Sequence, residues 1–194
     1  MNSPLLITLP GFFEGETRIC NALFAKGLER LHLRKPGATR EQQAKWIEEI
    51  APSCRRRIVL HDHHDLALQY GLGGIHLNSR NPDAPEWLDR KRFTLSRSCH
   101  SIKEVEDCQK DFDYVFLSPI FDSISKQGYK AAFTKEELAE AKRRGILQRN
   151  VYALGGITGG NLEEVERLGF YGAAMMGGFW DNPSLTLLKG RVYL

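Results

Sequence analysis

Two stretches decide the predicted fold: Val151-Tyr-Ala-Leu-Gly-Gly-Ile-Thr158 and, further along the chain, Gly172-Ala-Ala-Met-Met-Gly-Gly178. In each, an apolar run as short as a buried parallel strand stops at two adjacent glycines. Glycines let backbone amides approach a ligand closely, because no Cβ stands in the way. Asn161 is the predicted cap of a helix that begins at Leu162. Two successive turns of this kind favour an anion site, most simply for phosphate.

The same glycines also fit two tight turns that bind nothing. For a single pair the two interpretations weigh equally, whereas two pairs in consecutive units favour the phosphate site. In a (β/α)8 barrel such a site typically follows the seventh and eighth strands. We therefore expect Gly155, Gly156, Gly177 and Gly178 to bind a phosphate group.

Upstream, short apolar runs alternate with helical patterns in the same way. Six further strands are predicted at residues 5–9, 31–36, 58–62, 74–78, 93–100 and 114–118. Helices are predicted at 17–26, 40–51 and 64–70, and two more begin in capping boxes, Ser101 with Glu104 and Thr134 with Glu137. No linker interrupts the pattern, so we predict an α/β fold, a single compact (β/α)8 TIM barrel over residues 1–194. An open doubly wound sheet is the alternative, but the glycine fingerprint of dinucleotide-binding folds is missing after the first strand.

Composition excludes several classes of protein. The formal net charge of the 194 residues is only +3, and Lys and Arg are spread along the chain, which argues against a nucleic-acid partner. No apolar run reaches the length of a membrane span, and the N-terminal residues lack the features of a signal peptide. Four cysteines without metal-ligand spacing indicate reduced thiols and a cytoplasmic location, with Cys99 the one that could be reactive. The sequence leaves open whether the chain forms a homo-oligomer.

Working residues of a parallel barrel lie at the carboxyl ends of its strands. These ends carry Arg34, Lys35, His61, Asp62, His63, Asn78, Ser98, His100, Ser118, Ser123, Ser125 and Lys126. Nearly all of them are cationic or can donate hydrogen bonds, and Asp62 is the one carboxylate, so we expect a substrate that carries phosphate or pyrophosphate. By alternation along their strands, His32 and His76 are predicted to point away from this edge and to be structural.

Seven motifs, taken in order, carry a resemblance that covers almost the whole chain. They are Leu31-His-Leu-Arg34, Ile58-Val-Leu-His-Asp62, Gly74-Ile-His-Leu77, Ser98-Cys-His-Ser101, Asp113-Tyr-Val-Phe-Leu-Ser-Pro-Ile-Phe121, Ser123-Ile-Ser-Lys126 and Leu154-Gly-Gly-Ile-Thr158. Together they resemble thiamine-phosphate synthase (thiamine-phosphate pyrophosphorylase) and its relative, the thiazole tautomerase. The resemblance implies that a pyrimidine methyl diphosphate is coupled to a thiazole phosphate, with release of pyrophosphate.

The resemblance also implies roles for single residues. The predicted catalytic residues are Arg34, His61, Ser98 and Lys126, and Arg34, Ser98, Ser123, Ser125 and Lys126 would bind the diphosphate. Asp62 would hold Mg²⁺, for which an oxygen ligand is suitable. Gly156 and the backbone around Gly177 would hold the thiazole phosphate, with Gly155, Gly178 and His100 as further substrate-binding residues.

Departures from the synthase pattern keep two alternatives open. Pro36 stands where the family has a Lys, His61 stands for an Asn, and Asn78-Ser-Arg-Asn81 lacks the second metal-binding carboxylate. A metal-free thiazole phosphate tautomerase is the first alternative, with His61, His63 or His100 as the general acid or base. Yet Ser118-Pro119 keeps the synthase's proline where the tautomerase has its catalytic His. The second alternative is a binder of thiamine precursors without catalytic activity.

Overall fold

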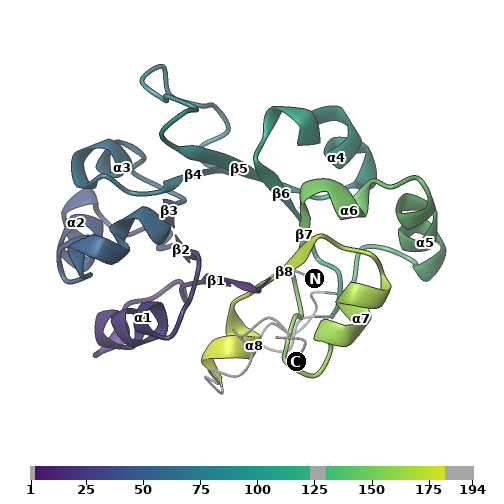
Figure 1. The fold of residues 1–194 in the computed structure, drawn as a ribbon, viewed down its shortest axis with the longest axis horizontal. Helices are drawn as coiled ribbons and strands as arrows, with labels where there is room; N and C mark the ends of the chain where they lie inside the picture. Colours follow the sequence, from purple (N-terminus) through teal and green to yellow (C-terminus); the bar gives the residue numbers. More distant parts are fainter. Residues whose placement is uncertain (1–2, 123–129, 182–194) are drawn as a thin grey trace. The chain divides into compact units, whose positions relative to one another are not determined.

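The structure, a computed structural model, describes residues 3–122 and 130–181. Its eight strands follow one another in sequence order around a closed parallel barrel, with helices between all neighbours along the chain except β4 and β5, which a loop joins (Figure 1). This confirms the predicted (β/α)8 TIM-barrel class. Two compact units make up the chain, one of residues 7–95 and one of residues 1–6 with 96–194. A single domain over 1–194 stays a prediction.

The unit of residues 7–95 contains three neighbouring parallel strands, β2 (Leu31–Leu33), β3 (Ile58–Leu60) and β4 (Gly74–Leu77). Leu33 pairs with Leu60, and Leu60 pairs with Ile75. Its helices are α1 (Glu16–Ala25), α2 (Arg40–Glu48), α3 (Asp65–Tyr70) and the 3-10 helix Pro52–Arg57. All three strands are buried along their whole length, so the polar residues that follow them start from fixed positions.

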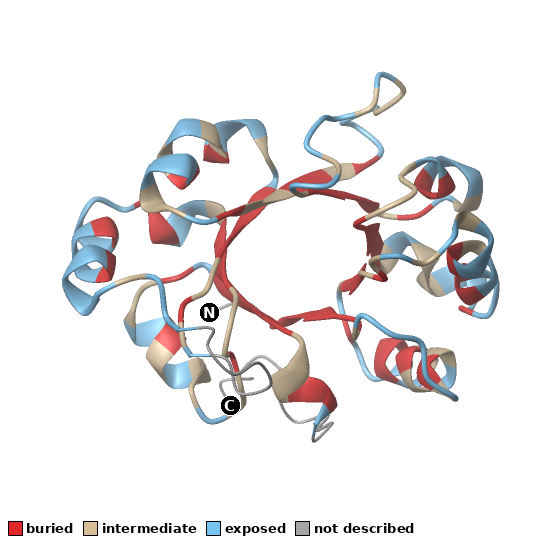
Figure 2. Cartoon of the chain, turned by 180° about the vertical axis from the view of Figure 1, so that it is seen from behind, coloured by how far each residue is buried: buried red, intermediate tan, exposed pale blue. Residues whose placement is uncertain are grey.

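The other unit contains the remaining strands and most of the helices. Strands β1 (Leu5–Ile7) and β5 (Thr94–Cys99) each cross the boundary between the units, and β6 (Tyr114–Leu117), β7 (Val151–Ala153) and β8 (Gly172–Met175) lie wholly within it. Its helices are α4 (Ile102–Cys108), the 3-10 helix Gln109–Asp111, α5 (Lys135–Arg143), α6 (Leu147–Asn150), α7 (Leu162–Arg167) and α8 (Gly177–Trp180). In both units the strands are mostly buried, while the helices bury one side and expose the other (Figure 2).

Helix ends follow the predicted chemistry with two differences. The capping box of Thr134 and Glu137 is complete at the start of α5. At α4, Ser101 accepts the Glu104 N–H, but the Glu104 carboxylate accepts from His100 N instead of completing the box. Asn161 precedes α7 without capping it, because its side chain accepts from Thr158 N and donates to the Gly156 carbonyl. Asn161 therefore closes the glycine turn that precedes the helix.

The surroundings of Cys99 do not favour a reactive thiol. Cys99 is buried, its sulfur lies 3.6 Å from that of Cys108, and burial raises the pKa of the Cys99 thiol far above its ordinary value. A thiol held in its protonated form is a poor nucleophile. Over the described residues, no helix is both long and apolar enough to cross a bilayer.

Candidate functional site

Lys35 does not share the environment of Arg34 at the end of β2, contrary to the prediction. The Lys35 side chain is fully buried, and its ammonium group donates to both oxygens of the Glu16 carboxylate at 2.7 Å. It also donates to the carbonyls of Leu9 and Gly11, while Trp46 donates to Glu16. A buried ion pair with every donor used is structural, so Lys35 anchors the loop between β1 and α1.

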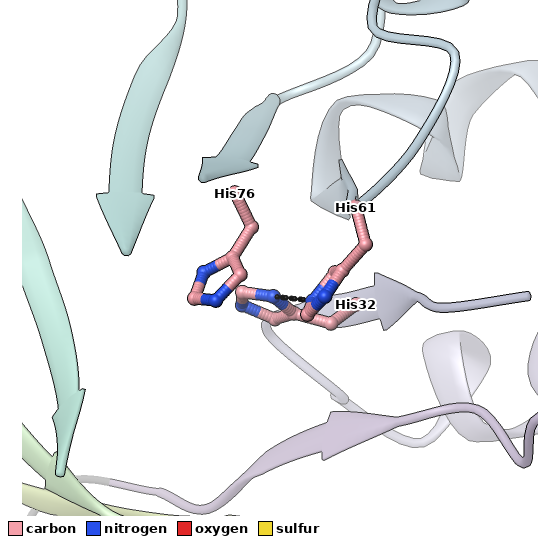
Figure 3. A group of neighbouring side chains, drawn as sticks. All are labelled: His32, His61 and His76. Atoms are coloured by element: carbon pink, nitrogen blue, oxygen red, sulfur yellow. Dashed lines mark hydrogen bonds between the residues drawn. The ribbon is translucent and has the colours of Figure 1, made fainter. Parts of the chain in front are cut away.

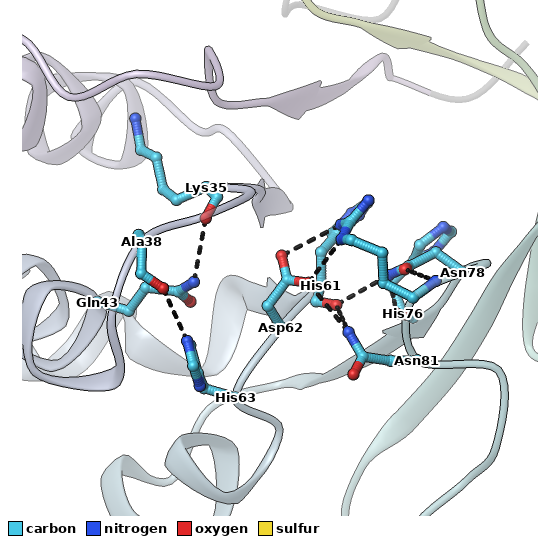
Figure 4. Close-up of polar contacts among 10 residues, drawn as sticks. Lys35, Ala38, Gln43, His61, Asp62, His63, His76, Asn78 and Asn81 are labelled. Atoms are coloured by element: carbon cyan, nitrogen blue, oxygen red, sulfur yellow. Dashed lines mark hydrogen bonds and ion pairs between the residues drawn. The ribbon is translucent and has the colours of Figure 1, made fainter.

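Asp62, the predicted metal ligand after β3, is held by an arginine that follows β4. Arg80 donates through Nε to Oδ1 at 3.1 Å and through its terminal nitrogen to Oδ2 at 3.2 Å. Asn81 donates to Oδ1 at 3.0 Å (Figure 4). This is the two-pronged geometry in which a guanidinium matches a carboxylate. The Asp62 side chain is 14% exposed and that of Arg80 is 40% exposed, so the pair lies at the surface of its unit.

Arg34 belongs to the same group. Burial, reinforced by the positive charge of Arg80, lowers the pKa of Arg34, and the nearby Asp62 opposes that shift. Two guanidinium groups therefore lie near one carboxylate at the ends of β2, β3 and β4. We call Arg34, Asp62 and Arg80 the arginine–aspartate cluster. Its net positive charge suits a phosphorylated ligand.

A short turn fixes the position of Arg80. The backbones of Asn78 and Asn81 exchange hydrogen bonds, and the Asn78 side chain accepts from Arg80 N. The side-chain amides of Asn78 and Asn81 both donate to the His61 carbonyl, which ties the turn to the end of β3. Sequence reasoning did not give Arg80 a role. The available signal was a pair of opposite charges, Asp62 and Arg80, following two adjacent strands.

His61 does not stand at the strand end with its ring exposed, as a predicted general acid or base would. Its ring meets those of His32 and His76 in a buried group (Figure 3). His32 and His76 are buried, as expected of structural residues, but His61, which was predicted at the functional edge, lies with them, and all three rings converge. Burial is the main cause that lowers the pKa of His32 and of His61 well below the ordinary value, and repulsion from the neighbouring imidazoles adds to it. Both rings are therefore neutral near pH 7.

His63 and His100 are held by backbone carbonyls. His63 has a positive φ of 51°, and its Nε2 donates to the Ala38 carbonyl at 2.9 Å, which joins the loop after β3 to the loop after β2. In the other unit, His100 Nδ1 lies 3.1 Å from the Ser118 carbonyl. A carbonyl can only accept, so Nδ1 of His100 carries the proton and Nε2 is left as an acceptor.

The predicted phosphate-binding glycines have packing reasons of their own. Gly155 and Gly156 have φ values of 94° and 64°, which favour glycine, and a Cβ on Gly156 would lie 2.4 Å from the Asp122 carbonyl oxygen. A Cβ on Gly178 would lie 2.2 Å from the Ile157 carbonyl oxygen. The turns after β7 and β8 are thus packed against each other, with Gly177 at the start of α8. This brings the two glycine turns together as predicted, and close packing alone explains the glycines at Gly155, Gly156 and Gly178.

Ser98 lies on β5 beside Phe116 of β6, half-buried. The remaining predicted diphosphate ligands, Ser123, Ser125 and Lys126, fall outside the described residues. The predicted site residues therefore divide between the units: Arg34, His61 and Asp62 belong to the first, and Ser98, His100 and the four glycines belong to the second.

Comparison with known proteins gives a consistent result. The model of the thiamine monophosphate synthase family matches residues 5–179. The thiamine-phosphate synthase of Listeria monocytogenes serotype 4b is 28% identical over 180 residues, covering 87% of this chain and 80% of the relative. That of Chlorobium limicola is 30% identical over 175 residues, covering 85% of this chain and 82% of the relative.

Solved structures agree with these relatives. The thiamine phosphate pyrophosphorylase of Bacteroides thetaiotaomicron superimposes with a TM-score of 0.82 at 38% identity, covering 96% of this chain and 91% of that chain. The enzyme of the same name from Pyrococcus furiosus has a TM-score of 0.72 at 19% identity, which supports the fold alone.

Proposed function

Because the chain belongs to the thiamine monophosphate synthase family, we propose that it couples a hydroxymethylpyrimidine diphosphate to a thiazole phosphate, giving thiamine phosphate and pyrophosphate. It is an enzyme of thiamine biosynthesis, of the transferase type. The relatives described above are named synthases or pyrophosphorylases, so the isomerase alternative is not favoured. The match of the family model from β1 to α8 is the observation that carries this proposal.

In this reaction the bond between the pyrimidine methylene carbon and the diphosphate oxygen breaks, and its electron pair leaves with the diphosphate. The lone pair of the thiazole nitrogen then forms the new C–N bond. Negative charge grows on the departing oxygen, so cations that bind it more tightly at that moment accelerate the step. Arg34 and Arg80 are suited to this role because a guanidinium donates several hydrogen bonds from a permanent positive charge.

The family resemblance implies Mg²⁺, but the residues at Asp62 do not fit it. Mg²⁺ needs oxygen ligands, commonly one or two carboxylates. Both oxygens of Asp62 already accept from Arg80, and Asn81 adds a third donor. Within residues 3–122 and 130–181, Asp62 belongs to no group of three or more acidic, histidine or cysteine side chains close enough to share an ion. A guanidinium beside the carboxylate also repels a divalent cation. We therefore propose that Arg34 and Arg80 neutralise the negative charge of the diphosphate, and we derive no step through a metal.

Other predicted residues keep the roles proposed for them. The turns that contain Gly155, Gly156, Gly177 and Gly178 are proposed to bind the thiazole phosphate, and their close approach to each other supports one shared site. Ser123, Ser125 and Lys126 are proposed as further diphosphate ligands. Ser98 and His100 are proposed to contact the substrates. For His100 the bond to Ser118 fixes a tautomer whose Nε2 can accept a proton.

A product assay tests the proposal. Purified protein is incubated with both substrates, and thiamine phosphate and pyrophosphate are measured by mass spectrometry and a coupled phosphate assay. We expect equal amounts of the two products, and we expect Arg34→Ala to lower kcat/KM while leaving the fold intact. If neither product forms under conditions in which a known synthase is active, the proposed function is wrong.

A further inference from the structure

We propose that His32, His61 and His76 form a binding site for a borderline transition-metal ion of the zinc class, with one imidazole nitrogen from each ring as ligand. We call these residues the histidine cluster. His32 lies within β2, His61 directly follows β3, and His76 lies within β4, so three adjacent strands each supply one ring (Figure 3). The proposal does not depend on the proposed function.

The backbone explains why these three side chains meet. His32 is paired with Val59 in the parallel register, and Leu60 is paired with Ile75, so the three histidines stand at nearby heights on neighbouring strands. Successive side chains along a strand point to opposite faces. The leucines that flank His32 and the apolar neighbours of His76 therefore occupy the other face, and the rings share one face of β2, β3 and β4.

The distances are close to those of a metal site. One candidate nitrogen from each ring can be chosen so that all three lie within 4.8 Å of one another. His32 Nδ1 and His61 Nε2 are 3.0 Å apart in a hydrogen bond, so the ring that donates has to move its proton to its other nitrogen before both atoms can bind the metal. Zn–N bonds of about 2.0–2.1 Å in a tetrahedral site place the nitrogens about 3.3 Å from each other. The His32–His61 pair is already near this value, and the remaining pairs need to close by no more than about 1.5 Å.

The ring orientations show that a side chain has to move before three nitrogens can meet one ion. His32 stands edge-on to both other rings, at 76° to His61 and 79° to His76. His61 and His76 are stacked, with centroids 4.2 Å apart and planes 25° apart. Stacked rings do not direct their nitrogens to one point, so metal binding requires a rotation of His76 or His61 within its side-chain torsions.

The chemistry of the cluster selects the metal. Three imidazoles without a carboxylate suit Zn²⁺, Co²⁺, Ni²⁺ or Cu²⁺ and do not suit Mg²⁺ or Ca²⁺, which take oxygen ligands. All three rings are buried, and burial keeps His32 and His61 neutral, the form in which an imidazole binds metal. His61, 4% exposed, is the one residue of the three with any solvent-exposed surface. Three protein ligands would leave a fourth position open to water or another small ligand.

The competing interpretation is a set of neutral histidines that only hydrogen-bond to one another. A metal titration of the full-length protein distinguishes the two interpretations. The protein is first treated with a chelator to remove metal and with a reductant to keep its thiols reduced, and it is then titrated with Co²⁺, a coloured probe for Zn²⁺ sites. We expect one equivalent of Co²⁺ to give the visible bands of a four- or five-coordinate ion, and one equivalent of Zn²⁺ to remove them. His32→Gln and His76→Gln, which keep a polar side chain of similar size, should each weaken binding by more than about 100-fold, beyond the range for losing an outer-shell partner.

Two controls identify the site. His63→Gln changes a histidine held by the Ala38 carbonyl outside the cluster and should leave binding unchanged. The sulfurs of Cys99 and Cys108 are the competing ligands, and binding there would add an intense sulfur-to-cobalt absorption that Cys99→Ser removes. The proposal is wrong if the wild-type protein takes up no stoichiometric Co²⁺ or Zn²⁺, if the absorption is that of a thiolate site, or if His32→Gln binds as tightly as the wild type. Since the wild-type titration alone can overturn the proposal, the result does not depend on the folding of the variants.

Discussion

Replacing Arg80 with alanine tests whether the arginine–aspartate cluster binds the diphosphate. In the wild type, two guanidinium groups and one carboxylate give the cluster a net charge of +1, and Arg80→Ala brings this to zero. A hydrogen bond to a charged group contributes about 1.5–3 kcal/mol. Because the Arg80 side chain is 40% exposed, solvent screening reduces this. We expect a loss of about 1–2 kcal/mol, which is about a 5–30-fold weaker affinity.

The assay is calorimetric titration of inorganic pyrophosphate into the protein with excess chelator, so that no metal contributes. Arg56→Ala is the matched control, because Arg56 is an exposed arginine of the 3-10 helix Pro52–Arg57 and its removal changes the net charge equally. Arg80→Lys retains the charge and loses the two-pronged geometry, so its affinity should fall between those of the wild type and Arg80→Ala. If Arg80→Ala and Arg56→Ala bind pyrophosphate equally well, Arg80 is not a ligand and the reasoning is refuted.

Other substitutions probe the same structure. Arg80→Asp supplies a second carboxylate beside Asp62 and should make pyrophosphate binding dependent on Mg²⁺; affinity that stays independent of Mg²⁺ in calorimetry would count against our account of why the metal does not fit. Lys35→Met leaves the Glu16 carboxylate buried without its partner and should lower the free energy of unfolding in urea by about 3–5 kcal/mol, an effect that Glu16→Gln in the same chain should partly reverse. Gly156→Ala places a Cβ against the Asp122 carbonyl at a φ of 64° and should destabilise the fold by about 1–3 kcal/mol, seen as a lower urea midpoint; an unchanged midpoint would show that the turn can relax. The pKa values of His32 and His61 are lowered in the folded state, so the metal-free protein should have their full contribution to stability above about pH 6.5 and lose it as pH falls below that value, by up to about 1.4 kcal/mol per pH unit for each ring; a urea midpoint that is flat from pH 7 to 5 would contradict this.

Much of the fold could be predicted because its signals are local. The apolar runs that became β2, β3, β6 and β7 end at polar or glycine residues, and these ends are where the structure places them to within two or three residues. Thr134 and Glu137 form their predicted capping box because both partners lie within one helical turn. The glycine pairs meet because consecutive strands of a parallel barrel are neighbours.

The parts that escaped prediction depend on partners far apart in the chain. Lys35 was expected beside Arg34, but successive side chains along a strand point to opposite faces. The Lys35 side chain therefore points to the other face, where it donates to Glu16, which also accepts from Trp46. Arg80 pairs with Asp62 through a turn whose shape is set by Asn78 and Asn81. The histidine cluster needs the register of three strands, which no single motif contains.

The most direct test of the central claim is the rate of thiamine phosphate formation by the wild-type protein, measured with Mg²⁺ and again with excess chelator. Since we propose that Arg34 and Arg80 neutralise the charge of the departing diphosphate, we predict that the product forms in both conditions. The two rates should differ by less than about tenfold, which corresponds to about 1.4 kcal/mol of activation free energy. Product that disappears on chelation would show that a metal carries that charge after all. The absence of product in both conditions, while a known synthase is active with Mg²⁺, would contradict the synthase function itself.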